Sequence, residues 1–329
     1  MPKTKTTPSS LQQLSFRSNP TLVGSIPFEL FLALSSLKIL TLSQSEISGA
    51  ITPEISNLNS LVHLDLSYNQ LSGPIPVELG QLKKLVGLDL SYNLLTGPVP
   101  QTIGQLGMLQ KLDLSSNSLS GTVPNSIGKL NSLVFMALSN NNIHGKLPIG
   151  LRDLKGLEYL IMDNNPMSTE LLTEFGRLSK LRELRLANSN YSGEIPASFS
   201  QLWNLTTLSL ENNRFTGKIP VGIANLSHIY HMNLSKNLLS GEIPFDTSFL
   251  KRVGENLDLS GNSELCLNPM QAYECAKLGV DVCNRRHRRV GNSSYEVKPL
   301  KTSEGQVVEI GRTSLCFVFL VLGALGLKY

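Results

Sequence analysis

Residues 61–84 read LVHLDLSYNQLSGPIPVELGQLKK, residues 85–108 read LVGLDLSYNLLTGPVPQTIGQLGM, and residues 109–132 read LQKLDLSSNSLSGTVPNSIGKLNS. The three segments align without a gap. An apolar residue opens this unit every 24 residues along the chain, at Leu37, Leu61, Leu85, Leu109, Leu133, Leu157, Leu181, Leu205, Ile229 and Val253. A fixed period of this length indicates a repeat architecture, in which stacked units share one continuous core.

The pattern inside each unit predicts its local structure. In LxxLDLSxN, the apolar residues at Leu64 and Leu66 alternate with polar ones, which is the period of a strand with one buried face. A recurrent Asn then offers an amide that can pair with backbone groups of the neighbouring turn, at 69, 93, 117, 141, 165, 213 and 237. A recurrent Gly permits a tight turn, and the following Ile-Pro or Val-Pro returns the chain along the convex side.

Some units depart from the rule. Ser45 and Ser189 replace the recurrent Asn, and the unit that begins at Leu157 lacks both the Gly and the Pro. We therefore expect a local irregularity in the convex face of that unit. A unit from Leu11 fits the pattern although it lies 26 residues before Leu37, and the last unit, at VGENLDLSGN, carries one extra residue.

The pattern LxxLxxLxLSxNxLxGxIPxxLGxL over residues 11–265 resembles the plant-specific leucine-rich-repeat class. The resemblance implies an α/β-type repeat solenoid, a right-handed superhelix with a parallel concave β-sheet and an irregular or 3-10 convex side. The segments LSFRSNPTLVGSIP, LEYLIMDNNPM and VGENLDLSGNSELCLNPMQAYECAKLGVDVC are similar to the kinase-less receptor-like group that includes Too Many Mouths, receptor-like protein 29 and piriformospora-insensitive protein 2. This second resemblance implies an ectodomain that binds a secreted peptide or a co-receptor, while a partner kinase carries out the signalling.

The domain organisation follows from these patterns. We expect a disordered stub over 1–10, about ten repeats and a partial last one over 11–265, a Cys-containing cap with a basic spacer over 266–300, and a polar spacer with an apolar tail over 301–329. Proteins of the resembled group begin with a signal peptide and a Cys-containing cap, whereas this chain begins MPKTKTTPSSLQQL. The absence of an apolar leader favours the interpretation that the sequence is incomplete at this end.

Cysteines and glycosylation motifs indicate an oxidising compartment. Cys266, Cys275 and Cys283 follow the last repeat, and a disulfide among them would pin the cap, with three pairings open. Zinc is a weak alternative, because the close CxxC pairs of zinc sites are missing. Candidate N-glycosylation motifs lie at Asn190, Asn204, Asn225, Asn233 and Asn292.

The C-terminal stretch 314–327, SLCFVFLVLGALGL, is apolar for 14 residues. It is short for a spanning helix, which needs about 20 apolar residues, and it fits the removable tail of a lipid-anchor signal. Both interpretations stay open, and both predict the extracellular face of the plasma membrane. The net charge of +4 also lies in this region, since segment 276–312 carries eight Lys or Arg against four acidic residues. The nearly neutral repeats argue against nucleic acid as a partner.

The variable strand positions predict the binding site. Residues beside the inward Leu pair point into the concave surface, and the middle and late units carry aromatic and charged residues there. The candidates are Phe135, Asn140, Tyr159, Ile161, Asp163, Arg182, Glu183, Arg185, Glu211, Tyr230 and His231. Arg182 and Arg185 suggest a site for a peptide carboxylate, which guanidinium groups pair with in a fork geometry.

No catalytic motif is present in the sequence, and no cofactor is expected. The five His residues are scattered, and no HExxH, GxSxG, GxxxxGK[ST] or kinase signature occurs. We therefore predict a non-catalytic, membrane-anchored receptor-like protein of plant defence or development, with a protein or peptide ligand and a co-receptor kinase as partners. Two alternatives remain: a secreted inhibitor resembling polygalacturonase-inhibiting proteins, and an intracellular interaction scaffold.

Overall fold

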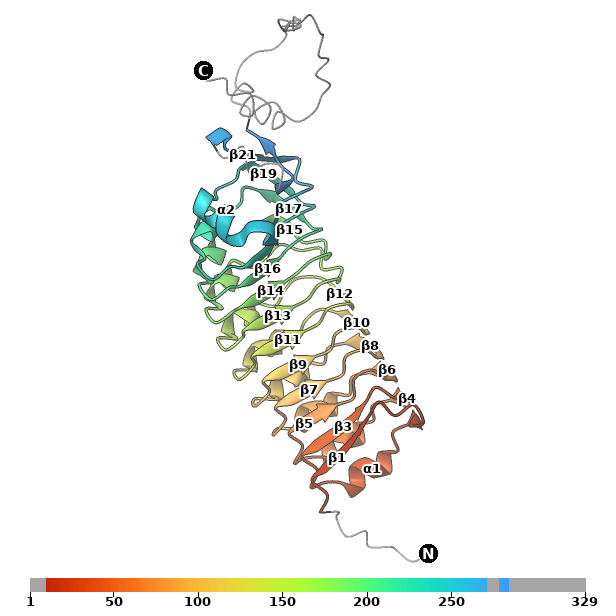
Figure 1. Cartoon of the computed structure of the whole chain (residues 1–329). Coiled ribbons are helices and arrows are strands. Elements are labelled where there is room, and N and C mark those ends of the chain that lie inside the picture. The colour runs from red at the N-terminus through yellow and green to blue at the C-terminus, as the bar shows by residue number, and fades with distance from the viewer. Residues whose placement is uncertain (1–9, 271–277, 284–329) are drawn as a thin grey trace, which may run out of the picture.

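The computed structural model describes residues 10–270 and 278–283, which form one curved solenoid (Figure 1). Its inner, concave side is a parallel sheet of 11 strands, one from each coil. These strands are β1 (Gln13–Arg17), β3 (Ile39–Ser43), β5 (His63–Asp65), β7 (Gly87–Asp89), β9 (Lys111–Asp113), β11 (Phe135–Ala137), β13 (Tyr159–Ile161), β14 (Glu183–Arg185), β16 (Thr207–Ser209), β18 (His231–Asn233) and β20 (Leu257–Asp258). The predicted solenoid with a parallel concave sheet is confirmed.

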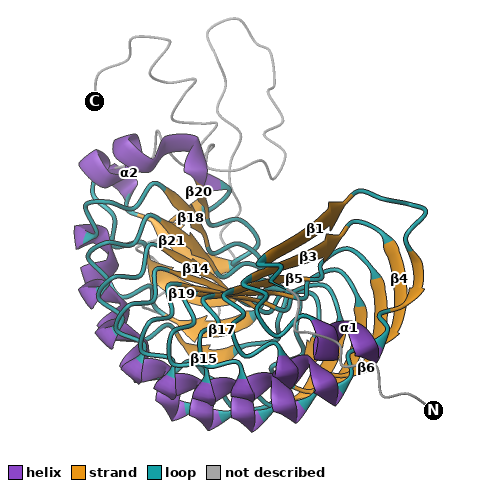
Figure 2. Cartoon of the chain, turned by 90° about the horizontal axis from the view of Figure 1, so that it is seen from below, coloured by secondary structure: helices purple, strands orange, loops and turns teal. Residues whose placement is uncertain are grey.

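Short helices line the outer side of the arc (Figure 2). They are α1 (Phe28–Ala33), the 3-10 helices η1 (Pro53–Asn57), η2 (Val77–Gln81), η3 (Gln101–Gln105), η4 (Asn125–Lys129), η5 (Ile149–Asp153), η6 (Thr173–Arg177), η7 (Ala197–Gln201), η8 (Val221–Asn225) and η9 (Gly254–Asn256), and α2 (Thr247–Val253). In the regular coils a proline precedes the 3-10 turn, as Pro76 does for η2. The prediction of a 3-10 convex side is confirmed.

Two further sheets, which the sequence analysis missed, lie between the concave strands and the outer helices. Six strands form the first, β2 (Val23–Ser25), β4 (Glu46–Ala50), β6 (Gln70–Pro74), β8 (Leu94–Pro98), β10 (Ser118–Gly121) and β12 (Asn142–Ile143). Five form the second, β15 (Ser192–Glu194), β17 (Arg214–Gly217), β19 (Leu238–Glu242), β21 (Glu264–Leu267) and β22 (Asp281–Val282). The recurrent glycine lies inside these strands, except for Gly145, which follows β12. Gly73 has a φ of +76°, which a residue with a side chain rarely adopts.

The core is a column of apolar side chains that runs through every coil. Leu64 and Leu88 pair in register on neighbouring strands and are both buried, as are Leu79 and Leu82 of the outer turn. Each buried leucine contributes roughly 1.5–3 kcal/mol relative to an exposed one. A single coil cannot bury these residues, because both of its flat sides are apolar, so the stack is the unit that folds.

The recurrent asparagine connects each coil to the one before it. The Asn93 amide nitrogen donates to the carbonyls of Leu90 and Ser91 in its own coil and of Leu66 in the preceding coil, at 2.9–3.1 Å. Its Oδ1 accepts from the Leu71 backbone nitrogen at 3.0 Å. The same pattern recurs at the other predicted positions and at Asn262 of the last coil.

The coil that begins at Leu157 is irregular, as predicted. Its outer turn η6 begins after Leu172 in place of a proline, and it contacts η5 less extensively than the other neighbouring 3-10 turns from η1 to η8 contact each other. The lateral sheets are also interrupted in this coil, between β12 and β15. Pro166, which has no N–H, stands where a lateral strand would begin.

In the next coil, the shorter Ser189 side chain replaces the asparagine and fills only part of its role. Its hydroxyl lies within hydrogen-bonding distance of the Ala187 and Met162 carbonyls. The hydroxyl also accepts from the Asn165 backbone nitrogen at 3.2 Å, and the Met167 nitrogen turns to the Ser189 carbonyl.

At the C-terminal end of the solenoid, Cys266 and Cys283 form a disulfide whose Cα atoms are 4.8 Å apart. The bond joins β21 to the segment that follows β22, and these two strands pair in parallel. Cys275 lies outside the described residues, as do the basic run 284–289 and the apolar tail 314–327.

We expect Asn93→Ala to lower the free energy of unfolding by about 1–3 kcal/mol, because the buried Leu71 N–H loses its acceptor. Chemical denaturation monitored by circular dichroism measures the change. Asn142→Ala is the control, since Asn142 is exposed and its side chain bridges no coils. Equal stability losses in the two variants would show that the ladder bonds add nothing.

We expect Tyr191→Phe to raise the melting temperature. Tyr191 is fully buried against Phe215, and within the described chain its hydroxyl has no hydrogen-bond partner, which is a cost of roughly 1–3 kcal/mol. Tyr230→Phe, at an exposed position, should leave the melting temperature unchanged. A lower melting temperature of Tyr191→Phe would mean that a bound water pairs with the hydroxyl.

Candidate functional site

The concave sheet presents the variable residues of each coil on one continuous surface. In a three-residue strand such as β13, the middle residue Leu160 is buried, whereas Tyr159 and Ile161 on either side of it face the concave surface. The residue before the strand and two residues of the following turn extend this surface. All eleven predicted binding residues occupy one of these positions, on β11, β13, β14, β16 and β18 or beside them.

Three predicted residues form an aromatic patch near the middle of the face, Phe135, Tyr159 and Ile161. The rings of Phe135 and Tyr159 lie on adjacent strands with their centroids 6.0 Å apart. Ile161 is half-buried at the end of β13. The Lys111 ammonium lies 5.7 Å from the Phe135 ring centroid, which is within the range of a cation–π contact.

Paired charges lie beside the aromatic patch. Arg182 Nε is 3.1 Å from Glu158 Oε2, and Arg185 Nε is 2.9 Å from Asp163 Oδ2. Glu183, which lies between the two arginines in the sequence, is farther from Arg185, at 3.8 Å. Each guanidinium therefore already has a carboxylate partner on the preceding coil, and a ligand carboxylate would have to compete with it.

Asp163 is held inside the surface. It is 5% exposed, and its Oδ1 accepts from the Ala187 backbone nitrogen at 2.8 Å. Burial raises the pKa of its carboxyl above the ordinary value, although the Ala187 N–H and Arg185 act in the opposite direction. Its geometry suits the positioning of Arg185 better than direct contact with a ligand.

The remaining predicted residues lie apart from the aromatic patch. Asn140 is in the exposed turn after β11 and accepts from Asn164 at 2.7 Å. Glu211 accepts from the Ser209 hydroxyl at 2.6 Å. Tyr230, 66% exposed, directly precedes β18, and His231 is its first residue. Strands β14 and β16 separate β18 from the patch on β11 and β13. The structure thus divides the predicted band into a central group and a separate C-terminal group.

A second feature of the concave face was missed by sequence reasoning. Gly87 occupies the first position of β7, where every other concave strand carries a side chain, and it leaves a hollow. We call this the glycine hollow; it is lined by Arg17, Ile39, Thr41, His63, Asp65, Gly87, Asp89 and Lys111. The sequence does carry an indication of this hollow, because a glycine inside a strand often marks the close approach of a ligand or another backbone.

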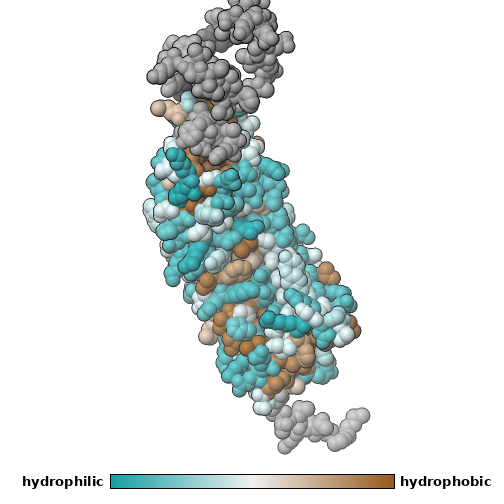
Figure 3. Space-filling view, in the orientation of Figure 1, coloured by the Kyte–Doolittle hydropathy of each residue, from teal (hydrophilic) through white to brown (hydrophobic). Residues whose placement is uncertain are grey.

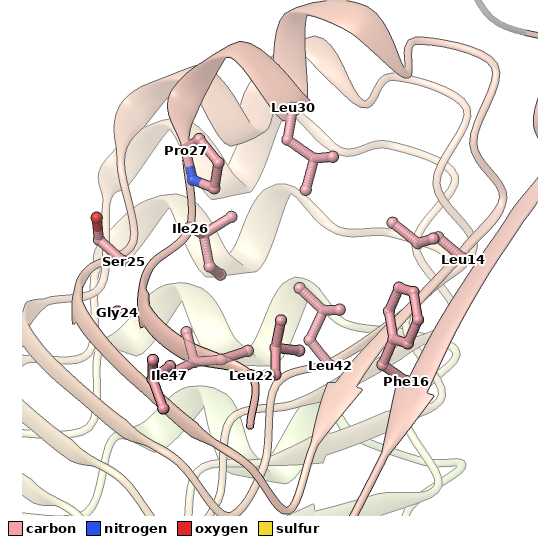
Figure 4. Close-up of a pocket in the computed structure, with 11 residues that line it drawn as sticks. Leu14, Phe16, Leu22, Gly24, Ser25, Ile26, Pro27, Leu30, Leu42 and Ile47 are labelled. Atoms are coloured by element: carbon pink, nitrogen blue, oxygen red, sulfur yellow. The ribbon is translucent and has the colours of Figure 1, made fainter. Parts of the chain in front are cut away.

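The N-terminal end of the solenoid carries an apolar hollow (Figure 4). Leu14, Leu22, Ile26, Leu30 and Leu42 point into it, from positions that adjacent coils cover elsewhere in the stack. Phe16 is 45% exposed at its rim. Figure 3 shows the same trend, with apolar residues on the visible face most frequent toward this end and polar residues over the rest.

Three of the predicted glycosylation positions, Asn190, Asn204 and Asn225, are exposed. Asn233 is half-buried on β18, and its Oδ1 accepts from the backbone and the hydroxyl of Ser235. Asn292 lies outside the described residues. Within residues 10–270 and 278–283, no group of three His, Cys, Asp or Glu side chains is arranged to hold a metal ion, and no helix has the length and apolarity to cross a membrane.

Comparison with known proteins identifies the repeat. The family model described as leucine-rich repeat region matches residues 91–194, and the model described as Leucine Rich Repeat matches residues 60–82 and 204–226. Receptor like protein 29 of Arabidopsis thaliana is 61% identical over 58 residues, which is 18% of this chain and 13% of that protein.

Solved structures of plant proteins share the whole solenoid. PEPR1 in its complex with AtPEP1 superposes with a TM-score of 0.73 and 31% identity, over 81% of this chain and 37% of PEPR1. The ectodomain of the Arabidopsis receptor kinase HAESA, bound to an IDA peptide hormone, has a TM-score of 0.69 and 28% identity, over 80% and 47% of the two chains. A plant ice-binding protein has a TM-score of 0.67 and 28% identity, over 83% and 84%.

This chain spans less than half of either receptor chain. It nevertheless shares their coil, their parallel concave sheet and their 3-10 outer turns. The matched segments are leucine-rich repeats, and the fold has the architecture of a plant leucine-rich-repeat ectodomain.

Proposed function

We propose that the chain is the non-catalytic, ligand-binding part of a cell-surface receptor-like protein, and that its concave face binds a secreted peptide or a segment of a partner receptor kinase. The observation that carries the proposal is the aromatic patch between charged residues. The Phe135 and Tyr159 side chains are half-buried. Aromatic side chains flanked by polar groups are typical of interfaces in which a few residues supply most of the binding energy.

The geometry of the face suits an extended peptide. The sheet is concave and continuous over 11 strands, so a chain laid along its axis meets a new set of side chains at each coil, about 4.8 Å apart. The HAESA ectodomain, of similar fold, was solved with a peptide hormone. The similarity to an ice-binding protein shows that the fold alone does not select the ligand, so the proposal rests on the surface residues.

The cell-surface location has separate support. The Cys266–Cys283 disulfide suits an oxidising compartment, and three glycosylation motifs are exposed. Attachment through the apolar tail 314–327 and signalling through a co-receptor kinase remain part of the proposal. The secreted inhibitor and the intracellular scaffold have no better support from the structure or from the relatives.

The test is a selection of random displayed dodecapeptides on the purified chain. We expect the double variant Phe135→Ser, Tyr159→Ser to bind the selected peptides with about 30-fold lower affinity, which is equivalent to the roughly 2 kcal/mol of a hot-spot residue. Affinities are measured by biolayer interferometry. Circular dichroism melts verify that the variant remains folded.

The matched control is Trp203→Ser combined with Val221→Ser, which removes two exposed apolar side chains from the outer side. This variant should bind the selected peptides as the wild type does. Peptides that lose affinity only in the control variant, or in neither variant, would place the binding surface away from the concave face and contradict the proposal.

A further inference from the structure

The glycine hollow and the aromatic patch lie on one line across the concave sheet. Gly87 of β7 is in register with Lys111 of β9, and Lys111 is in register with Phe135 of β11. Phe135 is thus two strand spacings from Gly87, about 10 Å, and Tyr159 is three spacings away, about 14 Å. Both features open onto the same face of the sheet.

The glycine hollow is bounded by groups of defined chemistry. His63 on β5 and Lys111 on β9 stand on either side of Gly87, and a Cβ on Gly87 would lie 2.7 Å from His63 Nδ1. The carboxylates of Asp65 and Asp89 form part of the lining. The His63 ring therefore lies over Gly87 at the edge of the hollow, and a side chain at position 87 would displace it.

The two carboxylates differ in what they can still bind. Asp89 Oδ2 already pairs with the Lys111 ammonium at 2.7 Å. Asp65 Oδ1 accepts from the nitrogen and the hydroxyl of Ser67. Within the described part of the chain, Asp65 Oδ2 receives no hydrogen bond, and its nearest cation, Arg17, is 3.9 Å away. A half-buried acceptor at the edge of a vacant space suits a cationic donor, whose charge-assisted bond is strong.

The aromatic patch has the complementary preference. Phe135, Tyr159 and Ile161 offer ring faces and an aliphatic side chain, without a free charge among them. An apolar or aromatic side chain is the group that gains from contact with such a surface. Lys111 lies between the two sites, bound to Asp89 on one side and near the Phe135 ring on the other, and so separates them.

We infer that this face binds a peptide in which a lysine or arginine is followed or preceded, three or four residues away, by an apolar or aromatic residue. The basic side chain enters the glycine hollow and reaches Asp65, and the apolar side chain packs on the aromatic patch. The spacing comes from the sheet, since about 10–14 Å corresponds to three or four residues of an extended chain that rises about 3.3 Å per residue. The inference rests on the proposed peptide-binding function and specifies its ligand class.

The experiment uses the full chain and the same library of random dodecapeptides, read by deep sequencing of the enriched pool. The expected result is an excess of basic and apolar residues three or four positions apart over the other separations. Enriched peptides should bind Asp65→Asn at least tenfold more weakly. Gly87→Thr should have the same effect, because it places a side chain at the edge of the hollow. The strand accepts this residue, since Thr207 occupies the equivalent position of β16.

Thr207→Ser, on the same sheet but outside both sites, serves as the control and should bind as the wild type does. The inference is overturned if the enriched peptides show no preferred separation, or if Asp65→Asn and Gly87→Thr bind them with wild-type affinity. If those peptides still lose affinity when Phe135 and Tyr159 are replaced, the proposed function is supported although this inference is wrong. A library that yields no binder contradicts the proposed function and this inference together.

Discussion

Every coil of this protein depends on the burial of its two flat, apolar sides against neighbouring coils. The hydrophobic residues cannot be shielded within 24 residues, so stability comes from the interfaces between coils. Stacking, however, also buries backbone groups that no strand or helix inside the coil can pair. The recurrent asparagine resolves this conflict, because one amide bonds to two carbonyls of its own coil, one carbonyl of the previous coil and one N–H of that coil.

Two adjacent coils that depart from this pattern show how far the backbone depends on it. With Pro166 at the start of the lateral strand in one coil and Ser189 in place of the asparagine in the next, the Met167 backbone nitrogen takes a different acceptor and the lateral sheet is interrupted. The concave sheet continues without a gap through both coils, since β13 and β14 pair in full register. The concave sheet therefore keeps its geometry where the lateral sheet is interrupted. The residues on its surface can vary without disturbing the packing between coils.

Freedom at the variable positions explains how a repeated fold acquires a particular surface. Phe135, Tyr159 and Gly87 occupy the same strand position in different coils. Phe135 and Tyr159 form the aromatic patch, whereas Gly87 lines the glycine hollow. The charged residues are mostly paired across coils, as in Arg185 with Asp163 and Lys111 with Asp89. Such pairs contribute little to stability at an exposed surface, but they hold long side chains in place, and they leave the Asp65 Oδ2 with a single, more distant cation.

The sequence alone predicted the repeat period, the strand pattern and the asparagine positions. Each coil has the same pattern of apolar and polar residues, so the structure expected for one unit applies to the others. The eleven candidate residues also fell on the concave surface for that reason. The lateral sheets were not predicted, since their strands read as a glycine turn until a neighbouring coil supplies the pairing partner. Which residues act together was decided only by the tertiary structure: the aromatic contact, the Arg–carboxylate pairs and the glycine hollow each join residues about one repeat apart, and their geometry depends on how the coils stack.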